Sequence, residues 1–423
     1  MFVTVVRPKM NSKIVLCCDG TWCGKATGTY DSNVKILANT IAEHNLVDGQ
    51  AHPRPDGHAT VCYFEGVGVD GTFEDYLVNG AIAEDIRAKC IEAYKFLVEE
   101  FVPGKKIWMI GFSRGAYTVR CVAGMINNFG IVNNEGLTDQ TLDDRCDTVY
   151  RMYRSRDPLY SPRGAYALEF KQAYSYDYDY PPIEFMGLFD TVGSLGIPKI
   201  DPEVSLSYDF YDQNVSSEVE HVFQGIVTHD RLFAFEPCFA RRRQGSHAAQ
   251  PVEVWFPGAH YDIGRVQFVP LRRGISLEGA LRFFQERTNI AGLNIDFTEE
   301  YSRNAFEWMV RRIQSIDDGM FNVDPAVAYN AYVIPHHLLL IRPITKNAYD
   351  VLYRRIKFIP FVDSIFGKQI IRDRHIPIYN ESSFYSSNNL PKQNEYLSGT
   401  SGNVSRAFDV RESIEFSLIM WTE

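Results

Sequence analysis

One short stretch of the chain has the residue types and spacing for nucleophilic catalysis. In "KKIWMIGFSRGAYTVR", residues 105–120, Ser113 lies between Gly111 and Gly115 in a G-x-S-x-G pattern. A serine held in a tight turn between a strand and a helix can attack an acyl carbonyl, and the flanking glycines give that turn room. Chance alone would supply the pattern with a probability of roughly 0.1 to 0.2. A glycine turn with an inert serine is therefore the competing interpretation.

A serine nucleophile needs a base and an acid, and two strand-end residues fit. Asp190 in "LFDTVGS" and His260 in "FPGAHYDIG" follow Ser113 in the order Ser, acid, His. Asp190 would hold the tautomer of the His260 imidazole and stabilise the imidazolium. The alternatives are an Asp190 that caps its own turn and a His260 satisfied by backbone groups. Asp230 and Asp262 are the substitute acids, although Asp262 is only two residues beyond His260.

The developing charge of an acyl-transfer intermediate needs two backbone donors. One is expected to be the amide of Arg114, the residue after the serine. The other is expected from the loop after the first apolar run, Asp19-Gly20-Thr21, where Gly20 permits close backbone approach. Asp19 itself suits a turn-former or a brace for this loop better than a catalytic acid.

A metal site is the weaker alternative for the same residues. Asp19, His260 and Asp262 have side chains that bind divalent ions. A metal would leave Ser113 unexplained, whereas a Ser-Asp-His triad explains it, so no metal and no cofactor is expected.

Short apolar runs position these residues. Runs that begin near residues 12, 59, 107, 183 and 252 are predicted to be buried strands, each of which ends beside a glycine. Helical spacing of apolar residues predicts helices over 80–101 and 114–130. This alternation indicates an α/β fold with a mostly parallel sheet covered on both faces, in which sites gather beyond the carboxyl ends of the strands.

Several phrases in order resemble one known family. "DGTW", "GVG", "AYKFL", "PGKKIWMIGFSRGAYTVRCVAGMI", "GLFDTVGS" and "WFPGAHYDIG" are similar to the microbial α/β-hydrolases related to type VI secretion phospholipase effectors, over roughly residues 12 to 300. The resemblance implies an α/β-hydrolase fold and a hydrolase of lipid or phospholipid esters. It also implies that Ser113 is the nucleophile, Asp190 the acid and His260 the base. Arg265 and Val266 replace a further glycine pair after the histidine, which puts the shape of that loop in question.

The triad predicts acyl transfer but not the leaving group. Ester hydrolysis of the lipase or phospholipase type is the favoured function. A thioesterase or peptidase with the same triad is the alternative, and a non-catalytic scaffold of the same fold is a weaker one.

Composition excludes some classes of protein. The 423 residues include 43 basic and 53 acidic side chains, a net charge of -10, which argues against a nucleic-acid-binding surface. No run approaches the ~18 apolar residues of a membrane span, and the N-terminus lacks a signal-peptide pattern, so a cytoplasmic location is expected. The eight cysteines are scattered, which favours reduced core thiols.

The chain is predicted to divide into a catalytic domain, 1–300, and a C-terminal extension packed on it, 301–423, with a separate C-terminal domain as the alternative.

Two segments could contact lipid. A tyrosine-rich insertion in the catalytic domain, about 142–182, is predicted to be lid-like, with a plain connector as the alternative. Basic and apolar residues alternate over 353–374, which suits either peripheral membrane contact or an ordinary scaffold segment.

Overall fold

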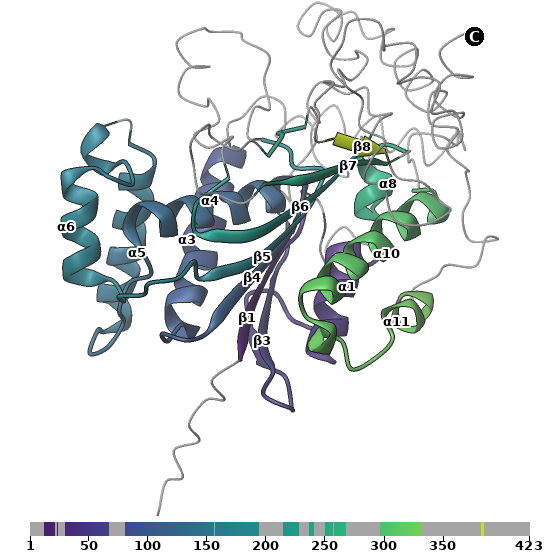
Figure 1. Ribbon diagram of the computed structural model, residues 1–423, viewed down its shortest axis with the longest axis horizontal. Coiled ribbons are helices and arrows are strands. Elements are labelled where there is room, and N and C mark those ends of the chain that lie inside the picture. Colours follow the sequence, from purple (N-terminus) through teal and green to yellow (C-terminus); the bar gives the residue numbers. More distant parts are fainter. Residues whose placement is uncertain are drawn as a thin grey trace, which may run out of the picture.

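The centre of the molecule is one eight-stranded sheet with the strand order β2-β3-β1-β4-β5-β6-β7-β8 (Figure 1). The computed structural model describes residues 12–21, 23, 30–66, 81–155, 157–193, 215–227, 237–240, 250–256, 258–267, 297–331 and 382–384. Neighbouring strands pair in parallel except β2 and β3, which confirms the predicted mostly parallel α/β sheet. The strands are β1 (Lys13–Cys18), β2 (Ala51–Pro53), β3 (Ala59–Phe64), β4 (Lys106–Phe112), β5 (Ile183–Phe189), β6 (Val219–Val227), β7 (Val252–Phe256) and β8 (Ser382–Phe384).

The inner strands are buried on both faces, which is why they are continuous apolar runs without alternation. In β1, Ile14, Leu16 and Cys18 belong to one core cluster. Val15 and Cys17 belong to a second cluster on the opposite face of the sheet. Each strand therefore needs apolar side chains at successive positions.

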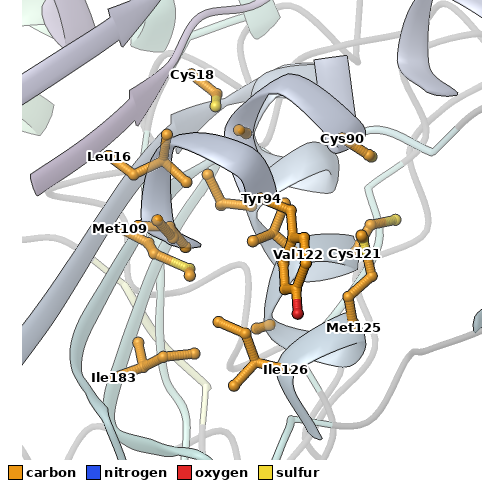
Figure 2. Close-up of a cluster of buried hydrophobic side chains, with 14 of the residues drawn as sticks. Leu16, Cys18, Cys90, Tyr94, Met109, Cys121, Val122, Met125, Ile126 and Ile183 are labelled. Atoms are coloured by element: carbon orange, nitrogen blue, oxygen red, sulfur yellow. The ribbon is translucent and has the colours of Figure 1, made fainter. Parts of the chain in front are cut away.

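Helices form the outer layers of this arrangement (Figure 1). One face is covered by α3 and α4, with α5 and α6 outside them, and the other face by α1, α10 and α11. Figure 2 shows the first core, where Leu16 and Met109 of the sheet lie beside Tyr94 and Val122 of α3 and α4. The helices are α1 (Asn33–Ala42), α3 (Ala81–Glu100), α4 (Ser113–Phe129), α5 (Asp139–Tyr153), α6 (Ala165–Tyr174), α8 (His260–Gly264), α10 (Glu299–Ile316) and α11 (Pro325–Ala331), with short 3-10 turns η1 (Pro158–Tyr160) and η3 (Asp318–Met320). The helices predicted over 80–101 and 114–130 are confirmed as α3 and α4.

The tyrosine-rich insertion forms α5, η1 and α6, which pack on α3 and α4. Arg87 of α3 pairs with Asp147 of α5. Gly124 of α4 makes room for Tyr153, because a Cβ there would lie 2.6 Å from the Tyr153 ring. The insertion therefore thickens one helical layer, and a lid-like role for it stays a prediction.

The C-terminal part begins inside the same core. The predicted boundary after residue 300 falls within α10, whose Phe306, Trp308 and Met309 are fully buried against the sheet. Farther along, β8 pairs in parallel with β7. The basic segment 353–374 lies outside the described residues.

Two further observations concern the described part of the chain. None of its helices combines the length and apolar character needed to cross a membrane. All eight cysteines fall within this part, where they are buried and free of disulfides.

Candidate functional site

The junction of β4 and α4 is a strained, tightly packed turn. Ser113 is the first residue of α4 and has φ 56°, in the left-handed region that a serine rarely adopts. A Cβ on Gly115 would lie 2.1 Å from the carbonyl oxygen of Cys18, and one on Gly111 would lie 2.6 Å from Cα of Ala116. Only glycine fits at either position, so both flanking glycines are required for the helix to start this close to the sheet.

Three side chains distant in sequence form one hydrogen-bonded chain at this turn. The Ser113 hydroxyl lies 2.7 Å from Nε2 of His260. Nδ1 of His260 lies 2.7 Å from Oδ2 of Asp190. The side chains of all three are almost completely buried. The structure thus brings together the serine, the histidine and the acid that the spacing predicted.

The end of β5 holds Asp190 in a second left-handed conformation, with φ 40°. Its backbone N–H donates to the carbonyl oxygen of Gly225 at 2.7 Å, and its Oδ1 accepts from the N–H of Val227 at 3.2 Å. The N–H of Val192 donates to the carbonyl oxygen of Ser113. The acid is therefore attached both to β6 and to the serine turn.

The neighbours of His260 fix the direction of its ring. His260 opens α8, and Asp262 accepts from the N–H of Ala259 at 2.7 Å and from the N–H of Thr298 at 2.6 Å. The carboxylate of Asp262 is thus used to brace the loop, while Asp190 contacts the imidazole. The ring of Phe112 lies 4.7 Å from the imidazole, centre to centre, and backs it.

Arg265 explains how the loop after the histidine closes without the further glycine pair. It adopts the left-handed conformation itself, with φ 59°, and ends α8. Its guanidinium is buried and donates to the carbonyl oxygen of Asp31 at 2.7 Å, while Glu299 lies 3.7 Å away. The buried contacts of the arginine side chain stabilise a left-handed backbone conformation that glycine would adopt at lower cost.

The loop after β1 contains two residues predicted for the oxyanion hole, Gly20 and Thr21, and their N–H groups differ in availability. The N–H of Gly20 donates to Oδ1 of Asp19 at 2.8 Å and is therefore occupied within the chain. Gly20 instead provides space, because a Cβ there would lie 2.4 Å from the ring of Phe112. Among the described residues nothing accepts the N–H of Thr21, which becomes the second candidate donor beside the N–H of Arg114.

Asp19 fits the brace that its position predicted. It is almost fully buried, and its Oδ2 accepts from the hydroxyls of Ser32 and Tyr63. Burial raises the pKa of its carboxyl, and the hydrogen bonds from Ser32 and Tyr63 oppose the rise. Because its acceptors face Ser32, Tyr63 and Gly20, Asp19 holds the loop to α1 and β3.

A buried polar network behind Asp190 escaped the sequence analysis. The Thr191 hydroxyl donates to Oε1 of Gln224, and Nε2 of Gln224 donates to Glu253 at 2.7 Å. Gln224 and Glu253 lie in buried stretches of β6 and β7. A polar residue inside a buried strand run was the available signal, because such a group must be hydrogen-bonded.

No group of three or more His, Cys, Asp or Glu side chains in the described part of the chain gathers as a metal site. Of the three residues weighed for one, His260 uses both ring nitrogens within the triad. Asp19 and Asp262 each bind hydroxyl or N–H donors of the chain.

Comparison with known proteins identifies related sequences. Residues 12–312 match the family described as "T6SS, Phospholipase effector Tle1-like, catalytic domain". A protein of Saccharomyces cerevisiae, "Uncharacterized protein YEL023C", is 29% identical over 203 residues, which cover 44% of this chain and 27% of the yeast protein. The chain thus spans about a quarter of the length of that relative.

Two solved structures are similar at low identity. A crystal structure of an uncharacterized protein from Pseudomonas aeruginosa is 14% identical, with a TM-score of 0.33, and the match covers 87% of this chain and 64% of the other. The structure of the Tle1 effector bound to the VgrG spike of the type 6 secretion system is 13% identical, with a TM-score of 0.34 and coverages of 86% and 82%.

Proposed function

The chain belongs to the family of Tle1-like phospholipase effector catalytic domains, and on that basis we propose that it is a serine hydrolase that cleaves carboxylic esters of lipids or phospholipids. The observation that carries the proposal is the chain of hydrogen bonds from Ser113 through His260 to Asp190. A serine, an imidazole and a carboxylate in this order form the acyl-transfer triad found on several unrelated folds.

The first half of the proposed reaction makes an acyl-enzyme. Ser113 Oγ attacks the ester carbonyl carbon while its proton moves to Nε2 of His260. Asp190 accepts the hydrogen bond from Nδ1–H and stabilises the imidazolium. When the tetrahedral intermediate collapses, the C–O bond to the alcohol breaks and His260 returns the proton to the leaving oxygen.

The second half releases the acid. Water takes the place of the alcohol and gives a proton to His260 as it attacks the acyl-serine. The intermediate collapses to the carboxylic acid, and His260 returns the proton to Ser113 Oγ. In both halves the negative oxygen would accept from the N–H groups of Arg114 and Thr21, and loss of one such donor costs about 2.7 to 4 kcal/mol of transition-state stabilisation.

Burial and strain support this assignment of roles. A left-handed serine and a left-handed aspartate are costly at about 1–3 kcal/mol each, and such strain collects at functional sites. The first turn of α4 lies directly after Ser113, where the positive end of the helix dipole favours a developing oxyanion.

Ser113→Ala tests the proposal on a panel of short esters, triglycerides, phospholipids, thioesters and peptides. We expect wild-type protein to hydrolyse at least one lipid ester and the variant to lose that activity while its melting temperature is kept. Turnover of thioesters or peptides alone would indicate the same triad with another leaving group. Wild-type hydrolysis by the variant would contradict the mechanism.

A further inference from the structure

Arg114 carries a side chain that the serine turn alone does not need. The position after the serine in a G-x-S-x-G turn must supply a backbone N–H, and almost any residue can do so. Here the whole residue is 1% exposed, and Nη1 donates to the Thr21 hydroxyl at 2.6 Å. Burial lowers the pKa of this guanidinium, which reflects the cost of holding the charge inside. A buried cation at this position therefore calls for a structural or catalytic reason.

The partner of Arg114 lies in the loop that follows β1. A turn in this loop is closed by the N–H of Cys23, which donates to the carbonyl oxygen of Gly20 at 3.0 Å. Thr21 is the second residue of the turn, whose N–H takes no part in the turn's own hydrogen bond. A Cβ on Gly66 would lie 1.6 Å from the carbonyl oxygen of Gly20, so the loop is backed closely by the chain after β3.

We propose that the Arg114 side chain positions the oxyanion hole by clamping Thr21. The N–H of Arg114 and the N–H of Thr21 would be the two donors, and the guanidinium–hydroxyl bond would fix the distance between them. One residue then supplies a donor from its backbone and holds the other donor with its side chain. The inference rests on the proposed function, because an oxyanion hole serves only an acyl-transfer site.

The contacts around both donors favour a clamp. Gly115 presses α4 against the carbonyl oxygens of Cys18 and Asp19, so the N–H of Arg114 is fixed relative to β1. Asp19 binds Gly20 and Cys23, the residues at the two ends of the turn that contains Thr21. The Arg114–Thr21 bond links the serine helix directly to this turn. Without it, the direction of the Thr21 N–H would depend on the ends of the turn and on the chain after β3 that backs it.

Thr21→Val and Thr21→Ser form the test. Valine keeps the shape but removes the hydroxyl that Arg114 binds, whereas serine keeps the hydroxyl. The readouts are kcat and KM for p-nitrophenyl butyrate and the rate of labelling of Ser113 by a fluorophosphonate. We expect valine to lower kcat and the labelling rate about 10-fold to 100-fold, part of the 10²-fold to 10³-fold effect of losing a donor entirely, with KM nearly unchanged. Serine should restore both rates.

Two further variants separate the clamp from simpler effects. Thr40→Val removes another buried threonine hydroxyl, which donates to the carbonyl oxygen of Ile36 within α1, and it should leave kcat unchanged. Arg114→Met should also lower kcat, as Thr21→Val does. The double variant should be no slower than the slower single variant, because both changes break one contact.

Three outcomes would overturn the inference. If Thr21→Val reacts at the wild-type rate, the contact does not position a donor. If Thr21→Ser is as slow as Thr21→Val, the hydroxyl is not the group that matters. Hydrolysis that persists in Ser113→Ala, measured in parallel, would overturn the proposed function and the clamp together, whereas failure of the Thr21 variants alone leaves the triad intact.

Discussion

The two ends of the sheet each hold a histidine bonded to an aspartate, but their surroundings differ. At the carboxyl end, His260 contacts Asp190 at 2.7 Å, and both side chains are 5% exposed or less. At the amino end, Nε2 of His58 lies 2.8 Å from Oδ2 of Asp317, with the two side chains 29% and 14% exposed. Asp317 also binds Lys13. A His–Asp contact is thus common to a structural cluster and to the candidate site.

Backbone strain separates the two ends. Of the four described non-glycine residues with positive φ, three lie at the carboxyl end: Ser113, Asp190 and Arg265. The fourth, Glu43, ends α1. The amino-end pair instead joins the start of β3 to the junction of α10 and η3, and neither of its residues has a positive φ. The candidate catalytic pair therefore differs from the structural pair in three ways: a serine hydroxyl contacts its second histidine nitrogen, its surroundings include strained backbone, and it is more deeply buried.

The largest expected contrast is between the two histidines. His260→Ala removes the base and should lower kcat by about 10⁴-fold to 10⁶-fold. His58→Ala should leave kcat at the wild-type level and lower the free energy of unfolding by at most about 1 kcal/mol, because it breaks only a partly exposed contact. Steady-state kinetics and urea denaturation of both variants provide the comparison. A similar loss of kcat in both variants would remove the distinction between the two ends.

The two aspartates should differ by nearly as much. Asp190→Asn keeps the shape but favours the wrong tautomer of His260, and we expect kcat to fall by about 10⁴-fold. Asp317→Asn should leave kcat unchanged. The rate of fluorophosphonate labelling measures the same contrast without a substrate. Normal labelling of Asp190→Asn would point to Asp230 or another acid.

A smaller effect is expected from the polar network behind Asp190. Gln224→Leu removes the buried acceptor of the Thr191 hydroxyl and one of the buried donors to Glu253, which should lower the free energy of unfolding by about 1–3 kcal/mol. Gln172→Leu, at an exposed position of α6, is the matched control and should change it by less than about 0.5 kcal/mol. Equal stability of the two variants would mean that the network is not a support for the acid.

The smallest expected effect is a pH dependence at the amino end. Burial alone would raise the pKa of Asp317, but hydrogen bonds from Lys13 and His58 outweigh it and lower the pKa. Because the folded-state pKa is depressed, this group stabilises the fold above the unfolded pKa and stops doing so as the pH falls through the folded pKa. Asp317→Asn should therefore be less stable than wild type at pH 7, and the difference should shrink in acid. Denaturation curves of both proteins at pH 7 and in acid measure this difference in stability. A difference that grows in acid would contradict the prediction.

Much of the fold could be predicted because it depends on local patterns. Continuous apolar runs indicated β1, β3, β4, β5 and β7, and helical spacing indicated α3 and α4. β6 was not predicted, since Glu220, His221 and Gln224 interrupt its apolar pattern. Its central position follows only from the pairing with β5 and β7.

The site could be predicted as far as its residue types and their order allow. Ser113, Asp190 and His260 stand at strand ends, which a sequence reveals. Which N–H groups stay available cannot be read in this way, because Gly20 loses its N–H to the side chain of its own neighbour, Asp19. The left-handed Arg265 depends on contacts with residues more than 200 positions away, such as Asp31.

Mass spectrometry of the protein after treatment with a fluorophosphonate tests the central claim most directly. The account predicts one adduct, mapped to the peptide that contains Ser113, formed rapidly by wild type and His58→Ala and very slowly by His260→Ala. No adduct in folded protein, or an adduct on another serine, would contradict the assignment of Ser113 as the nucleophile.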